Sequence, residues 1–423
     1  MGAGTAQRGA CLLISGKVRK NMEFVVFAGV LLLLFIFMIV QELIQTKNQE
    51  KLFKKYLREN YGKEPPKEYS LERFARLGSY LERHKEEKQL DDITWNDLGM
   101  DEVFRRIDRT YSAAGEEYLY YTLRNISCGR EALEHLEEVV NWLQEQENIK
   151  VRIQLLMKRL GHLGKYSLYD YLDNLDYLGE RSNRKIVLGN LLYLPFLLLL
   201  FVQPAMGTIG IVLCMLWHIM TYFREKKVIE PYIISFAYVL RLIDVCEELE
   251  KQKIPAYRRE LDELREALKS LRELRRGAYW VMAGNQGKIG GNPLDILADY
   301  LRMILHLDIF QFNRMLEKLR KKTGQVENML AITGYLDMAI SVGGFRKSLE
   351  GYCIPKLEED TEKAFLHMKK GWHPLLSQPV KNSIRADRGI LLTGSNASGK
   401  STFLKMVAVN AVLAQTIHTL SLI

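Results

Sequence analysis

Residues 389–405 read GILLTGSNASGKSTFLK, and the interpretation of the whole chain depends on them. The apolar run Ile390–Leu392 predicts a buried strand. A glycine-rich turn, Gly394–Gly399, follows it, and Lys400 opens an amphipathic helix that we expect to reach about Gln415. A strand, a loop of the form G-x-x-x-x-G-K-[ST] and a helix, in this order, are typical of a phosphate-binding loop.

Each residue type in this loop has a chemical reason to be there. The two glycines permit backbone angles that a Cβ atom disfavours, so that successive N–H groups can turn inward around a polyanion. Lys400 is predicted to reach the β- and γ-phosphates, and the Ser401 hydroxyl is predicted to ligate Mg²⁺. The predicted nucleotide site comprises Gly394, Ser395, Asn396, Ala397, Ser398, Gly399, Lys400, Ser401 and Thr402.

The composition limits the classes of protein to consider. A chain of 423 residues, with 48% hydrophobic and 26% charged residues, has material for two or three folded domains. The net charge of +9 suits nucleic acid or anionic lipid as a partner, and it equally suits solubility together with membrane-flanking cations. The five cysteines are scattered without a C-x-x-C pair, which argues against a disulfide framework or a zinc site.

Two apolar stretches predict membrane-spanning helices. Residues Phe24–Val40 carry no charge and match the lower limit for crossing a bilayer, about 17 residues. A signal peptide is the alternative for this stretch, but no small-residue cleavage site follows it, so we favour an uncleaved anchor. The second stretch, Ile186–Phe223, divides at Gln203-Pro204 and predicts a transmembrane hairpin, with a buried hairpin of a soluble fold as the alternative.

Basic residues on both sides of the second stretch predict its orientation. Arg181, Arg184 and Lys185 precede it, and Arg224, Lys226 and Lys227 follow it, so both ends are expected on the cytoplasmic side. We therefore predict a protein of the cell membrane with its soluble parts in the cytoplasm. Three aromatic residues of the hairpin are expected at the membrane interface or facing lipid: Tyr193, Trp217 and Tyr222.

The remaining segments predict helices. Residues Asp92–Leu98 indicate a turn into a capped helix, and residues 101–109 carry apolar side chains at 103, 104 and 107, which is helical spacing. After the hairpin, Val228 to about Leu274 predicts one long amphipathic helix. Its alternating charges are typical of an exposed coiled coil.

The loop and its surroundings resemble the MutS family of ATPases, relatives of the ABC and SMC ATPases. The loop sequence Asn396–Thr402 is similar to the family's, and His373-Pro374-Leu375-Leu376 followed by Asn382 resembles the segment that precedes it. Residues Ile107–Thr110, with Gly115–Leu119, resemble the start of the MutS core domain. Leu330–Leu357, which contains Leu336-Asp337, resembles the helix that leads to the ATPase domain. The resemblance covers about residues 91–178 and 315–415.

The resemblance implies further properties. ATP with Mg²⁺ would be the ligand, His373, Val380 and Asn382 would be further nucleotide contacts, and ATPase domains would pair in a homodimer with composite sites. DNA is implied as a possible partner. In the family an aromatic residue stacks on adenine at the position of Val380, so a weaker affinity or base preference is expected.

Two departures from the family pattern narrow the expected function. A membrane anchor takes the place of the mismatch-reading domain, and no Phe-x-Glu stretch is present, so we expect no specific mismatch recognition. A P-loop ATPase also needs a later strand that ends in an acidic residue. The chain ends at Ile423, about one helix after the loop, so we expect a protein cut within its ATPase domain and assign no catalytic residue.

The expected fold is mainly α: membrane helices, a MutS core and lever region, and the beginning of a P-loop α/β domain. The expected function is that of a membrane-anchored, MutS-like ATP-binding protein whose hydrolysis of ATP changes its conformation. The alternatives are an ABC-type membrane ATPase coupled to transport or gating, and a nucleotide-binding membrane scaffold without turnover.

The predicted segments, in chain order, are these: 1–41, an N-terminal segment with an anchor over 24–40; 42–90, a charged juxtamembrane helix; 91–180, the first part of the MutS core; 186–223, the hairpin; 224–365, lever and core helices; and 366–423, an incomplete ATPase domain.

Overall fold

The computed structural model describes residues 37, 40–41, 44–64, 69, 71–86, 88–126, 129–163, 167–275, 300–358, 365–395 and 399–422. The chain divides into two compact units, Met1–Asn60 and Tyr61–Ile423. In the first unit, residues 44–60 are helical, as predicted for the juxtamembrane segment. The predicted anchor over 24–40 lies outside the described residues, apart from Phe37 and Val40.

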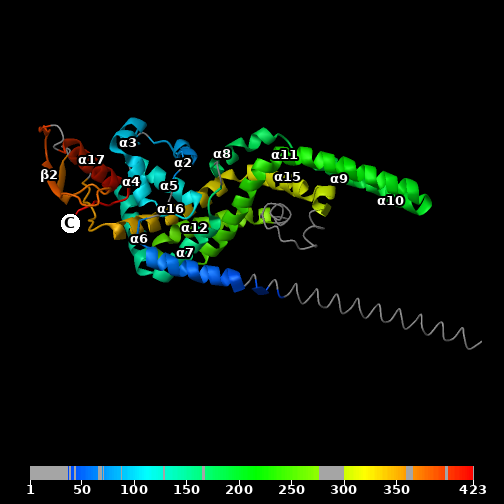
Figure 1. Ribbon diagram of the computed structural model, residues 1–423, viewed down its shortest axis with the longest axis horizontal. Helices are drawn as coiled ribbons and strands as arrows, with labels where there is room; N and C mark the ends of the chain where they lie inside the picture. The colour runs from blue at the N-terminus through cyan, green and yellow to red at the C-terminus, as the bar shows by residue number, and fades with distance from the viewer. Residues whose placement is uncertain are drawn as a thin grey trace, which may run out of the picture. The chain divides into compact units, whose positions relative to one another are not determined.

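The second unit is mostly helical, as the sequence predicts (Figure 1). Its helices and strands run in this order: α2 (Leu71–Arg83), α3 (Asp92–Leu98), α4 (Met100–Ile107), α5 (Ala113–Arg124), α6 (Arg130–Glu145), α7 (Glu147–Leu160), α8 (Leu168–Asp173), α9 (Arg184–Leu191), α10 (Tyr193–Val202), α11 (Pro204–Glu250), α12 (Arg258–Leu271), α15 (Leu307–Arg320), α16 (Thr323–Ser348), β1 (Leu366–Gly371), β2 (Asn382–Ala386) and α17 (Lys400–Thr416).

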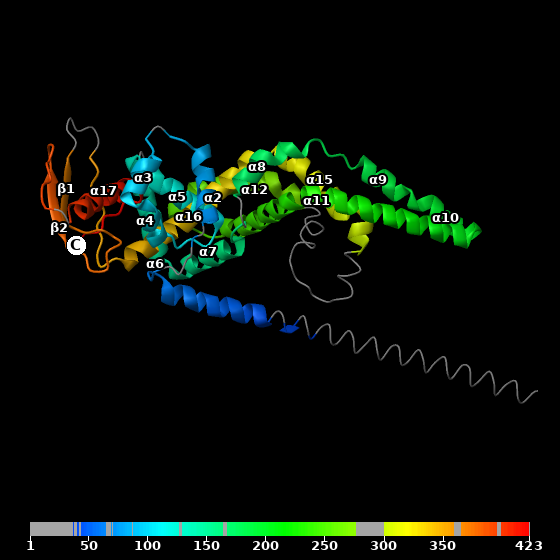
Figure 2. The same ribbon diagram turned by 45° about the horizontal axis from the view of Figure 1, so that its top comes forward.

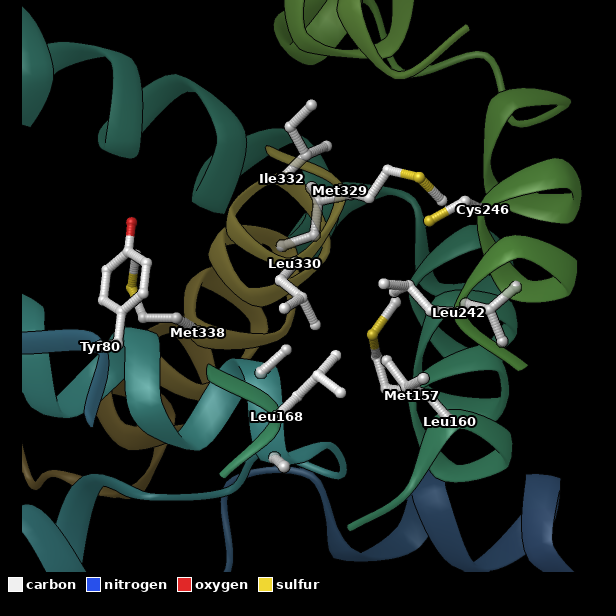
Figure 3. Close-up of a cluster of buried hydrophobic side chains, with 14 of the residues drawn as sticks. Tyr80, Met157, Leu160, Leu168, Leu242, Cys246, Met329, Leu330, Ile332 and Met338 are labelled. Carbon is white, nitrogen blue, oxygen red and sulfur yellow. The ribbon is translucent and has the colours of Figure 1, made fainter. Parts of the chain in front are cut away.

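Helix α16 lies at the centre of the helical core. It contacts α4, α5, α6, α7, α11 and α12, and it buries apolar side chains around its whole circumference. A helix that is hydrophobic all round is stable only when other helices cover every face. Figure 3 shows part of this core, in which residues of α16 approach residues of α7 and α11: Met329, Leu330, Ile332, Met157, Leu160, Leu242 and Cys246.

The helices at the start of the predicted MutS-like region form where the sequence places them. Helix α3 begins at Asp92, and the carboxylate of Asp91 caps it by accepting a hydrogen bond from the Thr94 N–H at 2.7 Å. In α4, the three apolar residues at helical spacing, Val103, Phe104 and Ile107, are fully buried. The predictions of a capped helix and of a buried face are confirmed.

The predicted hairpin consists of α9, α10 and the first part of α11, with the turn at Gln203-Pro204 as expected. Helix α10 and the part of α11 that pairs with it extend beyond the other helices of the unit, whereas Asn190 of α9 still donates to the carbonyl of Leu305, just before α15 (Figures 1 and 2). Residues 184–202 and 204–250 are long and apolar enough to cross a membrane, and only 6% of the apolar window of the first is buried. This exposure does not support the alternative of a hairpin buried inside a soluble fold.

Close packing between α10 and α11 depends on two glycines. A Cβ atom at Gly207 would lie 2.6 Å from the backbone nitrogen of Leu200, and one at Gly210 would lie 2.1 Å from the ring of Phe196. Small residues at such positions allow two helices to approach closely. The hairpin is therefore a packed helix pair.

Helix α11 does not end where the apolar stretch ends. It is one helix of 47 residues that crosses the predicted boundary at Phe223 and continues into the core, with Pro231 inside it. The prediction of a single helix from Val228 to about Leu274 is wrong, because helix α11 ends at Glu250 and a second helix, α12, begins at Arg258. Composition changes sharply at residue 224 while helical geometry does not, so a boundary drawn from composition misplaces the helix end.

Two further expectations are corrected. Helix α12 is not an exposed coiled coil: it packs on α11 and α16, and Leu261, Leu264, Leu268 and Leu271 are buried in that contact. Tyr222 is not a lipid-facing aromatic residue. Its side chain is buried, and its hydroxyl donates to the carboxylate of Asp308 at 2.8 Å.

Candidate functional site

The phosphate-loop segment has part of the geometry that its sequence predicts. Gly399 adopts a φ of 81°, a left-handed conformation that favours glycine, and α17 begins at the next residue. The Lys400 ammonium folds back over the loop and donates to the carbonyl oxygens of Gly394 and, at 2.8 Å, of Ser395. The predicted helix is confirmed, whereas Asn396, Ala397 and Ser398 lie outside the described residues.

The start of α17 is suited to an anion. The helix carries no acidic residue in its first turn, and the side chain of Ser401 is exposed there beside Thr402. The first N–H groups of a helix have no partner within the helix, and the helix dipole is positive at this end. The position of Ser401, immediately after the lysine, is the one from which a hydroxyl ligates Mg²⁺ in phosphate loops.

The predicted buried strand before the loop is not formed. Residues Ile390, Leu391 and Leu392 have no regular secondary structure and are 54%, 87% and 38% exposed. A central strand is buried only when strands on both sides satisfy its backbone groups. In the described part of the chain the one sheet is the antiparallel pair β1–β2, and it does not include residues 390–392.

The other predicted nucleotide contacts lie on the β1–β2 hairpin. His373 follows β1 and is buried, and its Nδ1 accepts from the Leu375 N–H at 3.4 Å. Burial, followed by the charge of Lys405 in α17, lowers the pKa of His373. The side chain of Asn382 donates to the carbonyl of Val380 at 3.0 Å, and Val380 itself is 78% exposed.

The structure brings one end of this hairpin to the loop helix. Asn410 of α17 donates to the carbonyl of Trp372, the neighbour of His373, at 2.9 Å. His373 is therefore beside α17, whereas Asn382 uses its side chain within its own turn and Val380 faces solvent. Of the three predicted contacts, the structure places His373 next to the helix that opens at Lys400.

The far end of α17 is held by residues that the sequence did not single out. Arg346, in the last turn of α16, donates to Thr419 Oγ1 at 2.9 Å and to the carbonyls of Ile417 and His418 at 3.2 and 3.1 Å. It also donates to both carboxylate oxygens of Glu137 in α6, at 3.1 and 2.8 Å. Arginine is suited to this position because its planar fork serves several acceptors at once.

The charge of Glu137 is strongly stabilised at this junction. Burial alone would raise the pKa of its carboxyl, but hydrogen bonds from His418 and Arg346 outweigh that effect and lower the pKa to about 2. The guanidinium of Arg346 is fully buried, and the Glu137 side chain is 19% exposed. The segment that directly follows α17 is thus attached to α16 by Arg346, whose mostly buried ion pair also joins α16 to α6.

The two MutS-like segments predicted from the sequence meet in the core. Asp337 of α16 accepts hydrogen bonds from the Ser112 N–H at 2.9 Å, from the Ser112 hydroxyl at 2.6 Å and from the Tyr111 N–H at 3.0 Å. A Cβ atom at Gly115 would lie 2.4 Å from a carboxylate oxygen of Asp337. Residues more than two hundred positions apart therefore form one buried polar contact, and their role is structural.

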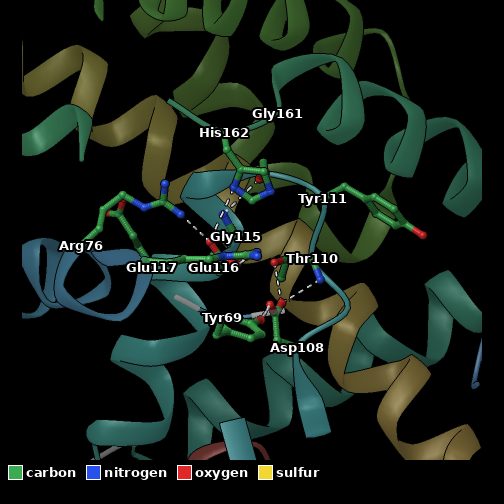
Figure 4. Close-up of polar contacts among 12 residues, drawn as sticks. Tyr69, Arg76, Asp108, Thr110, Tyr111, Gly115, Glu116, Glu117, Gly161 and His162 are labelled. Atoms are coloured by element: carbon green, nitrogen blue, oxygen red, sulfur yellow. Dashed lines mark hydrogen bonds and ion pairs between the residues drawn. The ribbon is translucent and has the colours of Figure 1, made fainter. Parts of the chain in front are cut away.

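A second polar cluster lies beside this contact (Figure 4). The buried carboxylate of Glu116 is paired with Arg73 and, at 2.8 Å, with Arg76, and His162 lies 3.5 Å from it. Asp108 accepts from the N–H and hydroxyl of Thr110 at 2.9 and 2.6 Å and from the hydroxyl of Tyr69. These groups are partnered within the core, which indicates a scaffold rather than a reaction centre.

Comparison with curated proteins relates part of the chain to MutS proteins. The chain is 28% identical over 123 residues to the human MutS protein homolog 4. The matched stretch is 27% of this chain and 12% of that protein. The chain is 31% identical over 124 residues to the DNA mismatch repair protein MutS of Leptospira interrogans, 27% of this chain and 14% of that protein. The corresponding protein of Acholeplasma laidlawii is 33% identical over 110 residues, 25% of this chain and 13% of that protein.

These matches define the extent of the relationship. The chain matches only 12% to 14% of the length of these relatives, and no protein-family model matches it. The partial similarity is to proteins named for DNA mismatch repair. It supports a MutS-like relationship for about a quarter of the chain.

Proposed function

We propose that this chain belongs to a membrane-anchored, MutS-like ATPase that binds ATP and Mg²⁺ at Gly394–Thr402. The observation that carries the proposal is the loop-to-helix geometry: Gly399 in a left-handed conformation, followed by Lys400 as the first residue of α17. The partial similarity to MutS proteins supports the same assignment. In this proposal, hydrolysis of ATP changes the conformation of the protein.

Each loop residue has a role in the proposed site. The Lys400 ammonium exchanges its two backbone carbonyl partners for the β- and γ-phosphate oxygens, which are stronger acceptors because they are charged. The Ser401 hydroxyl ligates Mg²⁺, and the N–H groups of the loop surround the phosphates. His373, which lies beside α17, is placed near the nucleotide, with Asn382 and Val380 as outer contacts.

The attachment of α17 provides a route from the nucleotide to the core. Arg346 fastens the end of α17 to α16, and α16 contacts α11, which continues into the apolar hairpin. A movement of α17 on binding or hydrolysis would change the contacts of Arg346 first. We propose that this helix series carries the conformational change.

The partners follow from charge, hydropathy and similarity. The apolar hairpin, residues 186–223, is proposed to insert in the cell membrane, with the soluble parts on the cytoplasmic face where the flanking cations lie. The net charge of +9 is compatible with DNA. Association as a homodimer through the ATPase domains, and DNA binding without specific mismatch recognition, are proposed by analogy with the MutS proteins.

The test begins with nucleotide binding. We expect the purified protein in detergent to bind a fluorescent ATP analogue in the presence of Mg²⁺, and Lys400→Ala to weaken binding by about ten- to a hundredfold. The loss corresponds to about 1.5–3 kcal/mol for a charge-assisted contact. Lys269→Ala is the control, since Lys269 is an exposed lysine of α12, a helix that packs on α11 and α16, and its loss should leave the affinity unchanged. Equal affinity in wild type and Lys400→Ala would contradict the proposed site.

ATP turnover by the full-length protein then separates the proposed function from its rivals. Phosphate release that duplex or branched DNA stimulates, and that Lys400→Ala abolishes, would support a DNA-handling ATPase. Turnover that DNA does not change would favour an ATPase that acts on a membrane or protein partner. Binding without turnover would leave a nucleotide-binding scaffold.

A further inference from the structure

A cavity of about 910 Å³ lies where the apolar hairpin joins the helical core. Residues of α9, α11 and α15 line it, together with the segment that precedes α9. The helices α9 and α11 meet at Gly189, where an added Cβ atom would lie 3.2 Å from the imidazole of His218. The cavity is thus at the level at which the proposed membrane helices emerge from the bilayer.

The lining changes from apolar to cationic along the cavity. Along α9 and the residue that follows it, the lining runs from Leu192 and Leu188 to Lys185, and on α11 it runs from Trp217 to Arg224. Because the chain reverses at Gln203-Pro204, the two helices run in opposite directions, and their cationic ends lie together. The cavity therefore has an apolar end toward the hairpin tip and a cationic end toward the core.

The charges at the cationic end are not all neutralised. Arg181 is held by Glu225 and by the side-chain oxygen of Asn313, at 2.9 Å. Lys185 and Arg224 are exposed, and the described residues provide neither with an ion pair; Glu180 is the remaining acid of the lining. The lining thus holds Arg181, Lys185 and Arg224 against Glu180 and Glu225, which leaves a positive excess.

We propose that this cavity binds one anionic phospholipid, with its phosphate at Lys185 and Arg224 and an acyl chain along Leu188, Leu192 and Trp217. The proposal rests on the proposed insertion of the hairpin in a membrane. A soluble phosphate would use the cations but leave the apolar end in water, whereas a phospholipid satisfies both ends. Trp217, which is 49% exposed, is a residue type favoured at the level of lipid headgroups.

The test measures lipid retained by the purified protein. The wild type, reconstituted in nanodiscs of phosphatidylcholine with phosphatidylglycerol, is extracted into mild detergent, and bound lipid is counted by native mass spectrometry. We expect one phosphatidylglycerol per chain and no retained phosphatidylcholine. Lys185→Gln with Arg224→Gln should weaken phosphatidylglycerol binding by about thirtyfold, at about fivefold for each cation.

A matched double variant removes the same charge nearby. Arg184→Gln with Lys227→Gln changes two exposed cations of the same juxtamembrane region that do not line the cavity, and it should retain the lipid like the wild type. Equal loss in the two double variants, or no loss in either, would overturn the site. If millimolar inorganic phosphate displaces the lipid, and binds to the lipid-free protein by itself, the cavity is an anion site. That result would overturn the lipid proposal.

Extraction of the membranes with alkaline carbonate separates this inference from the proposed function. A chain that resists extraction but retains no phosphatidylglycerol would contradict the lipid site and leave membrane insertion intact. A chain that carbonate releases would contradict membrane insertion, and with it the lipid site.

Discussion

At the scale of single residues, Arg346 connects the two parts of the structure that the proposed function requires. Its guanidinium serves Glu137, Thr419 and the carbonyls at the end of α17 at once, with no side-chain exposure. Breaking a buried ion pair by removing one partner leaves the other charge buried and unpaired. The junction is therefore sensitive to the shape of the side chain as well as to its charge.

We expect Arg346→Met to lower the free energy of unfolding by about 3 kcal/mol at pH 7. Arg346→Lys should recover only a small part of that loss, because an ammonium group cannot reproduce the planar fork. Urea unfolding followed by circular dichroism measures both variants. Full stability in Arg346→Lys would contradict the role of the fork geometry.

The same pair predicts a dependence on pH. The pKa of Glu137 is lowered to about 2, so its contribution to stability is complete above the unfolded value of about 4.3 and is lost as the pH falls toward 2. The difference in unfolding free energy between wild type and Arg346→Met should therefore be constant from pH 7 to about pH 5 and shrink below about pH 4. A difference that does not change between pH 6 and pH 3 would argue against the ion pair.

Residue-scale prediction from the sequence succeeded where chemistry is local. The glycine at 399 and the lysine at 400 follow from the loop pattern, and both take the expected conformation and position. Arg346 was missed because its partners lie about seventy residues later in the chain or in another helix. No local spacing in the sequence marks such a residue. Its position as a basic residue in the last turn of a helix is a general preference and does not identify its partners.

At the scale of elements, the contact between α5 and α16 determines the core. It joins the two predicted MutS-like segments. The two helices approach closely because each has a glycine at the contact, Gly115 on α5 and Gly334 on α16. A Cβ atom at Gly334 of α16 would lie 2.5 Å from the carbonyl oxygen of Ala114. A backbone atom cannot move aside as the end of a flexible side chain can.

We expect Gly334→Ala to destabilise the protein by about 1–3 kcal/mol, because the added methyl group forces α16 away from α5. Gly324→Ala is the matched control in the same helix, since nothing lies within 4 Å of its Cβ position. This control should be neutral or slightly stabilising, by up to about 1 kcal/mol. Equal midpoints of thermal unfolding for the two variants would contradict the close helix contact.

Periodicity predicted most helices but not their limits or partners. The helical face at 103, 104 and 107 and the hairpin turn at Gln203-Pro204 were correct. The strand at 390–392 was wrong, because an apolar run reveals a preference for burial but not the strands that would cover it. The exposed coiled coil was wrong for a similar reason: alternating charges describe the outer face of α12, while its leucines pack on α11 and α16.

At the scale of the whole molecule, the proposed topology places the hairpin tip across the membrane from the core. In intact cells of an expression host, we expect a membrane-impermeant maleimide to label Gln203→Cys. Tyr177→Cys, at an 85% exposed position before the hairpin, should be labelled only after permeabilisation. The native cysteines are replaced by serine in both variants. Equal labelling of both positions in intact cells would contradict a hairpin with cytoplasmic ends.

Because α11 is one uninterrupted helix, the rotation of its hairpin part about the helix axis is fixed relative to its core part. One residue inserted between Lys227 and Pro231 would rotate the hairpin part of α11 by about 100° and shift it by about 1.5 Å relative to the core. Seven inserted residues would complete nearly two turns and restore the orientation. Length variation in this segment among related proteins should therefore occur in steps close to whole helical turns, because only such steps keep the orientation of the hairpin relative to the core.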